Sequence, residues 1–466
     1  MRILLISPNQ EMLPDPVAPL GLASISSALK AKGHTVRLLD LCFSHRPTEA
    51  LKQGIEAFQP EVLGFSIRNV DNVAFPRTVS YLSFYRELLQ KCRTFTSAPL
   101  LLGGSGFTLM PREILAELDA DGGVAGEGEE VFPKILAQDF SSTPISIEGW
   151  VSRGAAGRVH PARVSDLDGL PSPDWEGIDL PTYFHRGGMG SLQTKRGCPL
   201  HCIYCTYPII EGTQVRLRSP ERVAEDALAL VQKGIENAFI VDNVFNQPPD
   251  HALEICRMFQ EKRLPLKWSC YAHPGAFSAS LARAMKEAGC TGIEFGIDSG
   301  AKKVLERLGK DFSPAQIRQA TRLAQAAGLE VCLSLSLGGP GETEGTLRET
   351  FDLMAELSPT AVIAMIGLRI FPQTRLAQIA AEEGLIAPSH NFLPPVFYLA
   401  PEVSRKILEW AEAAASIHRN WIFPGLGINV SEPLQAKLRR IGVRGPLWEH
   451  MKLLRGRGAF RRGSHG

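Results

Sequence analysis

The chain lacks both a large excess of charge and a long apolar run. Its 50 lysines and arginines nearly balance its 49 aspartates and glutamates, which gives a formal net charge of +1 over 466 residues. No apolar stretch reaches the roughly 20 residues that a membrane-spanning helix needs. The charge balance excludes a strong attraction of the whole chain to nucleic acid or to anionic membranes, so partners must be inferred from local sites.

The chain also lacks the pattern of a secreted, disulfide-rich protein. Its nine cysteines fall into three within one short segment and six that are scattered, which is no disulfide framework. The first eight residues have one basic residue and a short apolar run that ends in proline, so they predict a strand and no signal peptide. We therefore expect a cytoplasmic protein. The scattered cysteines lie in or beside apolar segments and are expected to be buried free thiols: Cys42, Cys92, Cys256, Cys270, Cys290 and Cys332.

The three remaining cysteines form the most informative feature of the sequence. Cys198, Cys202 and Cys205 lie in the segment KRGCPLHCIYCTYP, residues 195–208. Thiolates prefer zinc and iron–sulfur clusters over harder ions, and three of them on one loop suit a cluster with one iron left open. Zinc would need His201 or a distant cysteine as a fourth ligand, and a disulfide would leave one cysteine over. The spacing favours the cluster.

The first 140 residues alternate apolar strands with amphipathic helices. Strands are expected at residues 2–7, 35–40, 62–67, 100–104 and 122–125, with helices near 18–32, 47–58 and 78–92. This rhythm predicts an open, doubly wound parallel sheet whose ligands bind at the carboxyl ends of the strands. The loops at three of these ends are polar or rich in glycine, which lets backbone amides approach a ligand, although tight turns alone would also explain the glycines. Their candidate binding residues are Arg68, Asn69, Gly103, Gly104, Ser105, Gly106, Gly126 and Glu127.

A second βα series follows a segment rich in turn residues. Residues 141–190 have no helical or strand period and are interpreted as a linker between domains. Strands are then expected near 191–194, 238–241, 267–271, 292–297, 331–337 and 361–370, within a domain that spans 191–375. Residues 376–466 are predicted to be mainly helical and to cover the substrate, with helices at 376–383, 401–417 and 433–440 and a solvated basic tail at 455–462.

The cysteine segment, with Tyr204 just before its third cysteine, resembles the signature of the radical S-adenosylmethionine (SAM) superfamily. In that family three cysteines hold a 4Fe–4S cluster, and the amine and carboxylate of SAM chelate the fourth iron. The resemblance implies a partial (β/α)6 barrel over residues 191–375, with Cys198, Cys202 and Cys205 as the metal ligands and catalytic residues.

The same resemblance implies contacts with SAM at other strand ends. Asp242 and Asn243 follow the second strand, where the family binds the amine of SAM, although its usual Gly-Gly-Glu is missing here. Glu294 lies in the fourth strand, and Asp298 and Ser299 follow at its end; the inward face of this strand contacts the ribose and carboxylate in the family. Glu294, Gly296 and Asp298 alternate with Phe295 and Ile297. Asp298 or Ser299 alternatively caps the helix that follows.

The N-terminal half resembles the cobalamin-binding domain that precedes the barrel in one large class of these enzymes. Its glycine-rich loops would line the nucleotide tail and the corrin edge. The D-x-H-x-x-G motif, whose histidine ligates cobalt from below in many cobalamin proteins, is absent. We therefore expect that no histidine of this domain ligates the cobalt. Arg68, Asn69 or Asp71 would face the lower side of the cobalt instead.

Together the two halves imply a cobalamin-dependent radical SAM methyltransferase in small-molecule biosynthesis. Its cofactors would be a 4Fe–4S cluster, SAM and cobalamin, its partners a small substrate and an electron donor such as flavodoxin or ferredoxin, and no nucleic acid. In such enzymes a 5'-deoxyadenosyl radical activates an unreactive carbon, which takes a methyl group from methylcobalamin.

Other functions use the same domains. One is a cobalamin-dependent oxidoreductase, cyclase or ring-rearranging enzyme without net methyl transfer, and another is a non-catalytic cobalamin or redox sensor. An RNA-modifying methylthiotransferase would need a basic RNA-binding module and a second compact cysteine group, and the sequence has neither.

Overall fold

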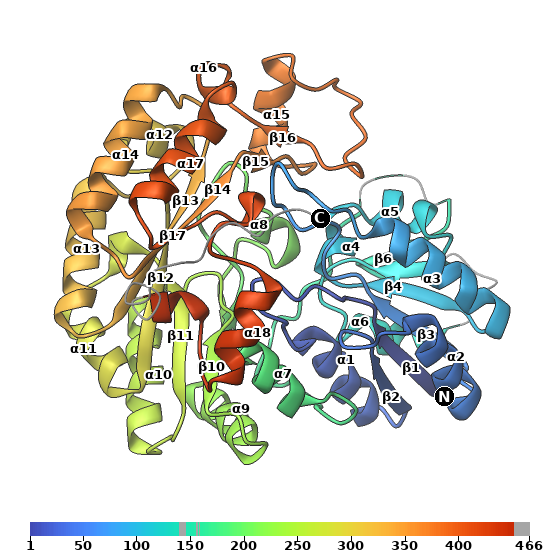
Figure 1. Cartoon of the computed structure of the whole chain (residues 1–466). Helices are drawn as coiled ribbons and strands as arrows, with labels where there is room; N and C mark the ends of the chain where they lie inside the picture. Colours follow the sequence, from blue (N-terminus) through green and yellow to red (C-terminus); the bar gives the residue numbers. More distant parts are fainter. Residues whose placement is uncertain (139–145, 155–156, 158, 452–466) are drawn as a thin grey trace.

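The computed structural model describes residues 1–138, 146–154, 157 and 159–451. In this part of the chain the strands form two large sheets, of six and seven strands, and two short two-stranded ribbons. Each large sheet is covered by helices, and the two lie side by side in Figure 1. The predicted α/β architecture is confirmed. Residues 139–140, residues 141–145, 155–156 and 158 of the expected linker, and the basic tail at 455–462 lie outside the described residues. The linker was expected to have no helix, but it contains α7 (Leu180–Gly187).

The N-terminal sheet is parallel except at one edge. β1 (Arg2–Ser7), β2 (Thr35–Asp40), β3 (Val62–Ser66), β4 (Leu100–Gly103) and β5 (Gly122–Val124) run parallel in the order β2-β1-β3-β4-β5. These are the five expected strands. β6 (Trp150–Ser152), which was not predicted, pairs antiparallel with β5. Because the strand order reverses between β1 and β3, a crevice opens at the carboxyl ends of these two strands.

Helices cover both faces of this sheet, which explains the continuous apolar runs of its strands. They are α1 (Leu20–Ala31), α2 (Pro47–Phe58), α3 (Leu82–Phe95), α4 (Ser105–Leu109), α5 (Pro111–Glu117) and α6 (Val131–Leu136). Ile3 and Leu5 pack in one core with α1 and α6, while Leu4 and Ile6 pack in the other with α2 and α3. α3 begins later than expected because residues 71–80 fold back on themselves through an antiparallel bridge between Asp71 and Ser80.

The second sheet has the predicted parallel strands and one strand more. β7 (Gly190–Leu192), β10 (Asn237–Ile240), β11 (Lys267–Ala272), β12 (Cys290–Asp298), β13 (Glu330–Leu337) and β14 (Ala361–Ile366) lie next to one another in chain order. β17 (Trp421–Ile422), from the C-terminal region, pairs with β14 at the edge. Its two residues are too few to give a strand period that the sequence could reveal.

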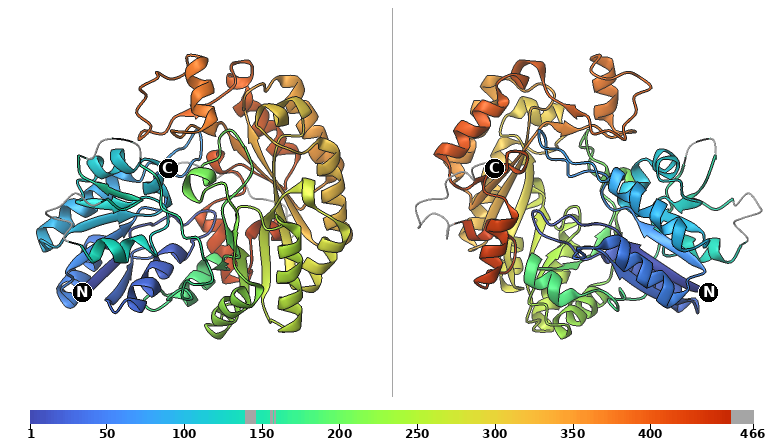
Figure 2. Two further views of the ribbon diagram at one scale, coloured as in Figure 1. Left: turned by 180° about the vertical axis from the view of Figure 1, so that it is seen from behind. Right: turned by 45° about the vertical axis from the view of Figure 1, so that its right-hand side comes forward.

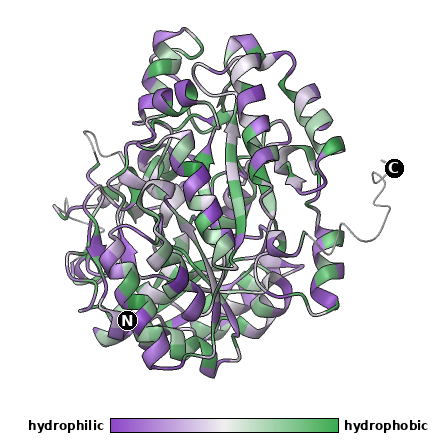
Figure 3. Cartoon of the chain, turned by 90° about the vertical axis from the view of Figure 1, so that its left-hand side faces the viewer, coloured by the Kyte–Doolittle hydropathy of each residue, from purple (hydrophilic) through white to green (hydrophobic). Residues whose placement is uncertain are grey.

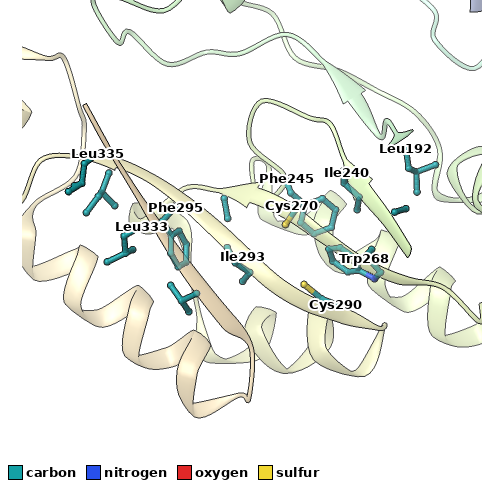
Figure 4. Packing of buried hydrophobic residues seen from close by; sticks show 14 of the residues in the cluster. Leu192, Ile240, Phe245, Trp268, Cys270, Cys290, Ile293, Phe295, Leu333 and Leu335 are labelled. Atoms are coloured by element: carbon teal, nitrogen blue, oxygen red, sulfur yellow. The ribbon is translucent and has the colours of Figure 1, made fainter. Parts of the chain in front are cut away.

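Helices cover the outer face of this curved sheet, as Figures 1 and 2 show. They are α9 (Pro220–Gln232), α10 (Pro249–Glu261), α11 (Ala279–Glu287), α12 (Lys302–Arg307), α13 (Pro314–Ala326) and α14 (Glu344–Leu357). Alternate strand residues such as Ile293, Phe295 and Leu333 form the buried layer beneath them (Figure 4). The helices carry both hydrophobic and hydrophilic residues (Figure 3), as expected of helices with one face on a core. In the described residues every helix is too short or too polar to cross a membrane.

The C-terminal region contributes at both ends of the barrel. Its helices are α15 (Arg375–Glu382), α16 (Pro401–Ser404), α17 (Ile407–Ile417) and α18 (Glu432–Arg440), so the helix expected over 401–417 is interrupted at residues 405–406. β15 (Leu368–Arg369) and β16 (Phe397–Tyr398) pair beyond the carboxyl end of β14. At the opposite end, Trp448 and Met451 pack against Cys332 and Ala361. This packing closes the amino end of the barrel.

Candidate cofactor site

The cysteine loop follows the first barrel strand and is closed by its own backbone. β8 (Lys195–Arg196) and β9 (Arg216–Leu217) pair antiparallel and frame the loop, which includes the short α8 (Tyr207–Ile210). The Cys198 amide donates to the carbonyl of Gly212 at 3.0 Å. Gly197 has φ +92°, and a side chain there would come within 2.1 Å of the Gln214 carbonyl. Glycine at this position therefore lets the loop close tightly.

The loop is also docked onto the mouth of the barrel. The Ile203 amide donates to the Leu308 carbonyl at 3.1 Å, and the Leu376 amide donates to the Ile203 carbonyl at 2.9 Å. These bonds tie the loop to the ends of α12 and α15. The position of the cysteines is thus set by two elements outside the loop, α12 and α15.

The three thiols fit a cluster. Cys198 is buried and the other two are partly buried. Burial raises the pKa of all three thiols, that of Cys205 to about 12, and negative charge on neighbouring cysteines raises the pKa of Cys198 and Cys205 further. Such thiols become thiolates when a bound cation stabilises them. In the described residues no three His, Cys, Asp and Glu side chains are placed to share one ion, whereas a 4Fe–4S cluster takes each thiolate on a different iron.

A buried ionic group lies beside the cysteines. Lys310 Nζ is 2.6 Å from Asp298 Oδ2 and donates to the Gly296 carbonyl at 3.2 Å, and the Tyr204 hydroxyl donates to Asp298 Oδ2 at 2.5 Å. Burial raises the pKa of the Cys202 thiol, and the ammonium of Lys310 opposes this rise. The group therefore links the expected residues Tyr204 and Asp298 to a lysine that sequence reasoning missed. Lys310 lies in a turn after α12 and carries no motif.

Replacing Lys310 with methionine is expected to weaken the cluster. The change removes the cation beside Cys202 and leaves the Asp298 carboxylate buried without its ionic partner. Outer partners of metal ligands typically contribute about 10–100-fold in affinity or activity. We expect a loss within this range, measured as the iron retained per chain during anaerobic dialysis against a chelator. Lys302→Met is the matched control, because its side chain is 76% exposed; an equal loss there would contradict the assignment.

The two polar residues after β10 have different surroundings. The Asp242 carboxylate accepts from the Thr194 amide at 2.8 Å and from the Thr194 hydroxyl at 2.5 Å, and it lies 3.6 Å from Lys195 Nζ. It is fully enclosed by these partners, so the predicted contact with SAM falls to Asn243. The Asn243 amide donates to Glu211 Oε2 at 2.7 Å, while its buried Oδ1 has no partner. An unpaired buried acceptor suits a ligand that brings a donor.

The three residues expected on and just after the fourth barrel strand, β12, are spread over different environments. Asp298 lies at the barrel mouth and has φ +62°, which turns its carboxylate toward Lys310. Ser299 is buried; its hydroxyl contacts Thr350 at 3.1 Å and accepts from the Ala301 amide at 3.1 Å, which is the helix-turn role that was its alternative interpretation. Glu294 lies deeper in the barrel and bonds to Ser334. The structure therefore does not bring these three residues to one point.

A cavity of about 330 Å³ opens at the carboxyl ends of the N-terminal strands. Arg68 and Glu127 line it, as do the expected glycine-rich loop residues Gly103, Gly104, Ser105 and Gly126. Asn9 also lines it, and its buried Oδ1 has no hydrogen-bond partner. A cavity of this size with glycine edges and an unpaired acceptor fits the tail of a corrinoid. Sequence reasoning missed three of its polar lining residues because a single polar residue at a strand end or on a helix carries no motif: Ser7, Asn9 and Ser24.

Not every residue expected around cobalamin lines this cavity. The Asn69 carbonyl accepts from the Tyr85 hydroxyl, and a side chain at Gly106 would come within 3.0 Å of the Arg68 carbonyl. These two residues thus support the loop from behind. The Asp71 carboxylate, expected as an option below cobalt, instead pairs with Arg369 at 3.0 Å, with both side chains buried. Of the three residues expected at that face, Arg68 alone lines the cavity.

Glu127 has an additional role that its motif did not predict. The Arg216 guanidinium donates two hydrogen bonds to its carboxylate, at 2.6 and 2.7 Å. Arg196 Nη1 lies 3.2 Å from Glu127 Oε2, and the Val164 amide donates to the same oxygen at 2.8 Å. Arg196 also bonds to Glu129 at 2.7 Å. Because Arg196 and Arg216 frame the cysteine loop, this ion network fastens the cobalamin cavity to the cluster site.

Two family models match this chain. Residues 192–354 match the radical SAM superfamily and residues 13–136 match the B12-binding domain. The first match contains the cysteine loop and the second contains most of the cavity residues. The chain belongs to the cobalamin-dependent radical SAM family. It is therefore an enzyme whose cofactors are a 4Fe–4S cluster, SAM and cobalamin.

Related proteins of this family align along most of the chain. It is 27% identical to tryptophan 2-C-methyltransferase of Streptomyces laurentii, over 82% of this chain and 74% of that protein. It is 25% identical to cytidylyl-2-hydroxyethylphosphonate methyltransferase of Streptomyces wedmorensis, over 76% and 77%. The fold resembles that of the radical SAM methyltransferase TsrM from Kitasatospora setae, with a TM-score of 0.85, 24% identity and coverage of 97% and 98%.

Proposed function

We propose that this radical SAM enzyme transfers a methyl group from SAM, by way of cobalamin, to an unactivated carbon of a small molecule. One observation carries the proposal: the cobalamin cavity is lined on its far side by Gln193, Arg196 and Val241 of the barrel. Arg196 lies two residues before Cys198, so bound cobalamin and the iron–sulfur cluster would face a common space. The similarity to two methyltransferases supports this reaction.

The protein's own residues hold and orient the cofactors. When bound, cobalamin supplies a methyl carrier and the cluster supplies single electrons to SAM. Cys198, Cys202 and Cys205 would hold the cluster, and the unpaired oxygen of Asn243 would accept from the amine of SAM. Arg68 would face cobalamin from the N-terminal sheet. Lys310 and Asp298 would fix Tyr204 beside the cluster and keep water out of this buried corner.

The domain limits expected from the sequence remain part of the proposal. Residues 1–140 would bind cobalamin, 141–190 would link the domains and add β6 to the N-terminal sheet, and 191–375 would form the radical SAM barrel. Within 376–466, the part near the carboxyl ends of the barrel strands would cover the substrate. We further propose a cytoplasmic location and a low-potential donor such as flavodoxin or ferredoxin. The support for both is chemical, because an open iron–sulfur cluster and unpaired thiols persist in a reducing compartment.

Methyl transfer can be measured directly. The enzyme, purified without oxygen and supplied with cobalamin, is incubated with SAM carrying a 13C methyl group, a low-potential reductant and a set of candidate small molecules. We expect the label to appear on a carbon of the product, detected by mass spectrometry and NMR. We also expect S-adenosylhomocysteine to form in an amount at least equal to the product, because each methyl group leaves SAM in this way.

The control is the same enzyme prepared without cobalamin, which should give no labelled product. A product that forms without label would overturn the methyltransferase assignment and favour an oxidoreductase, a cyclase or a ring-rearranging enzyme. Absence of 5'-deoxyadenosine alongside labelled product would count against the radical step alone.

A further inference from the structure

The inner face of the barrel is more accessible than the face that packs against the helices. On β12 the inward residues Glu294 and Gly296 keep accessible surface, while Ile293, Phe295 and Ile297 are buried. The same alternation occurs on β13 and β14, where Ser334, Ser336, Ile363 and Met365 are the accessible residues. In a filled barrel the inward side chains would be buried by one another. This barrel therefore contains an open space.

Gly296 keeps this space open. A Cβ atom built on it would have no heavy atom within 4 Å, unlike the crowded glycines of the cysteine loop. Its φ lies outside the left-handed region, so the backbone would tolerate a side chain. We call the space the barrel hollow, defined by Phe239, Tyr271, Glu294, Gly296, Ser334 and Met365.

Glu294 lies near the floor of the barrel hollow. It is in register with Tyr271 on β11 and with Cys332 on β13. Cys332 packs against Trp448, one of the C-terminal residues that close the amino end of the barrel. Asp298, at the mouth, is four residues further along the strand, which corresponds to roughly 13 Å. Glu294 therefore lies well below the group that surrounds Cys202.

The carboxyl group of Glu294 has no cationic partner among the described residues. Its one hydrogen bond comes from the Ser334 hydroxyl at 2.5 Å. Burial raises its pKa to about 7. The titratable groups that face it are Tyr271 and Cys332, whose own pKa values its charge raises. Neither provides the positive charge that would stabilise a partly buried carboxylate.

The remaining walls are apolar or aromatic. Phe239 meets Tyr271 edge to face, with ring centroids 4.9 Å apart, and Ile363 and Met365 lie on the opposite strand. Tyr271 is 38% exposed although it lies inside the barrel, so part of its ring faces open space. Tyr207, from the cysteine loop, and Arg68 of the cobalamin cavity are close enough to affect its pKa. The barrel hollow therefore lies close to the cofactor region.

We infer that the barrel hollow binds the substrate, and that Glu294 binds an amine or N–H group of a compact, largely apolar molecule whose ring or chain lies against Phe239, Tyr271 and Met365. This rests on the proposed function, since it names the substrate class of the same site. It replaces the contact between Glu294 and SAM that the sequence suggested. A substrate amine would supply the partner that Glu294 lacks.

Matched pairs of probes test this assignment. Binding of tryptamine and tryptophol, and of phenethylamine and 2-phenylethanol, is measured by anaerobic equilibrium dialysis against the enzyme loaded with cluster and cobalamin. Each pair differs in one group, an amine against a hydroxyl. We expect the wild type to bind the amines about tenfold or more tightly than the alcohols, as for a hydrogen bond to a charged group. Glu294→Gln should remove this preference and change the affinity for the alcohols less than threefold.

Two further variants separate binding from folding. Glu449→Gln alters a second buried carboxyl of raised pKa, which bonds to Ser269 and Thr291 below the barrel hollow, and it should keep the preference for amines. Gly296→Leu should fill the barrel hollow and weaken all four probes at least tenfold, with unchanged iron and cobalamin content. Equal effects of Glu294→Gln and Glu449→Gln would overturn the inference, as would a wild type that binds no probe or shows no preference.

The outcome is distinguishable from failure of the proposed function. If amines bind through Glu294 but no amine-bearing compound receives labelled methyl, the pocket stands and the methyltransferase assignment fails. If a product is methylated while Glu294→Gln leaves its binding unchanged, the reaction stands and the inference fails.

Discussion

Replacing Cys198, Cys202 or Cys205 with alanine is expected to remove the iron–sulfur cluster and all turnover of SAM. Each thiolate holds one iron, and no other cysteine lies on the loop to replace it. His201 cannot readily do so, because its carbonyl packs against Gly309 and its side chain is exposed. The loss should exceed the roughly 10–100-fold effect of outer partners, because the ligand itself is removed. Iron, sulfide, S-adenosylhomocysteine and 5'-deoxyadenosine are measured on anaerobically reconstituted protein.

Cys256→Ala is the matched control for these variants. Cys256 is a fully buried free thiol on α10, within the same barrel but away from the cysteine loop. It should keep the iron content and the activity of the wild type, apart from a modest loss of stability from the vacated volume. A cysteine-loop variant that still held iron and cleaved SAM would refute the assignment of the cluster ligands.

The parts of this enzyme that sequence could predict are those encoded by neighbouring residues. Strands such as Val62–Ser66 are short apolar runs between turn residues, and the cysteine spacing lies within eight positions. Both are local patterns with a direct physical meaning. The fold class and the cluster motif follow from them.

The individual contacts with cofactors could not be predicted in the same way. Asp242 and Asn243 look alike in sequence, yet Thr194 and Lys195 occupy the first while the second keeps an unpaired oxygen. The residue that decides between them lies 48 positions away. A strand-end motif indicates which polar residues could bind a cofactor. Only the tertiary structure shows which of them are already bonded to other residues of the protein.

Contacts between the two halves are equally distant in sequence. Asp71 pairs with Arg369 and Asp15 with Arg439, across separations of 298 and 424 residues. Each is a buried ion pair that joins a loop of the N-terminal sheet to the barrel or its C-terminal extension. With the network around Glu127, they fix the cobalamin cavity relative to the cluster at separate points. A methyl carrier must be held in this way, since a shift of about 1 Å at a reacting centre can cost 100-fold in rate.

The network around Glu127 is the point where this coupling should be most sensitive. Glu127→Gln leaves Arg216 and Arg196 buried with a neutral partner, and breaking a buried ion pair costs about 3–5 kcal/mol. We expect the free energy of unfolding to fall by an amount in this range, measured by urea denaturation at pH 7. We also expect faster loss of cobalamin on gel filtration, because the same residue lines the cavity.

The pH dependence of this loss has a definite sign. Burial alone would raise the pKa of Glu127, but its bonds with Arg216 and the charge of Arg196 outweigh burial and lower the pKa below its ordinary value of 4.5. A carboxylate with a lowered pKa stabilises the fold above its unfolded pKa and loses this contribution as the pH falls through the folded pKa. The stability difference between wild type and Glu127→Gln should therefore be largest near neutral pH and shrink below pH 4.5.

Glu130→Gln provides the control for this prediction. Glu130 lies three residues further on and pairs at 3.7 Å with Lys134, with both side chains exposed. Exposed pairs of this kind contribute about 0–1 kcal/mol, so this variant should keep its stability and its cobalamin. The free energy of unfolding should fall less in the double variant Glu127→Gln with Arg216→Met than the sum of the falls in the two single variants. Each single variant leaves one buried charge without its partner, and the double variant removes both charges. If the two losses simply add, Glu127 and Arg216 do not stabilise the enzyme as a pair.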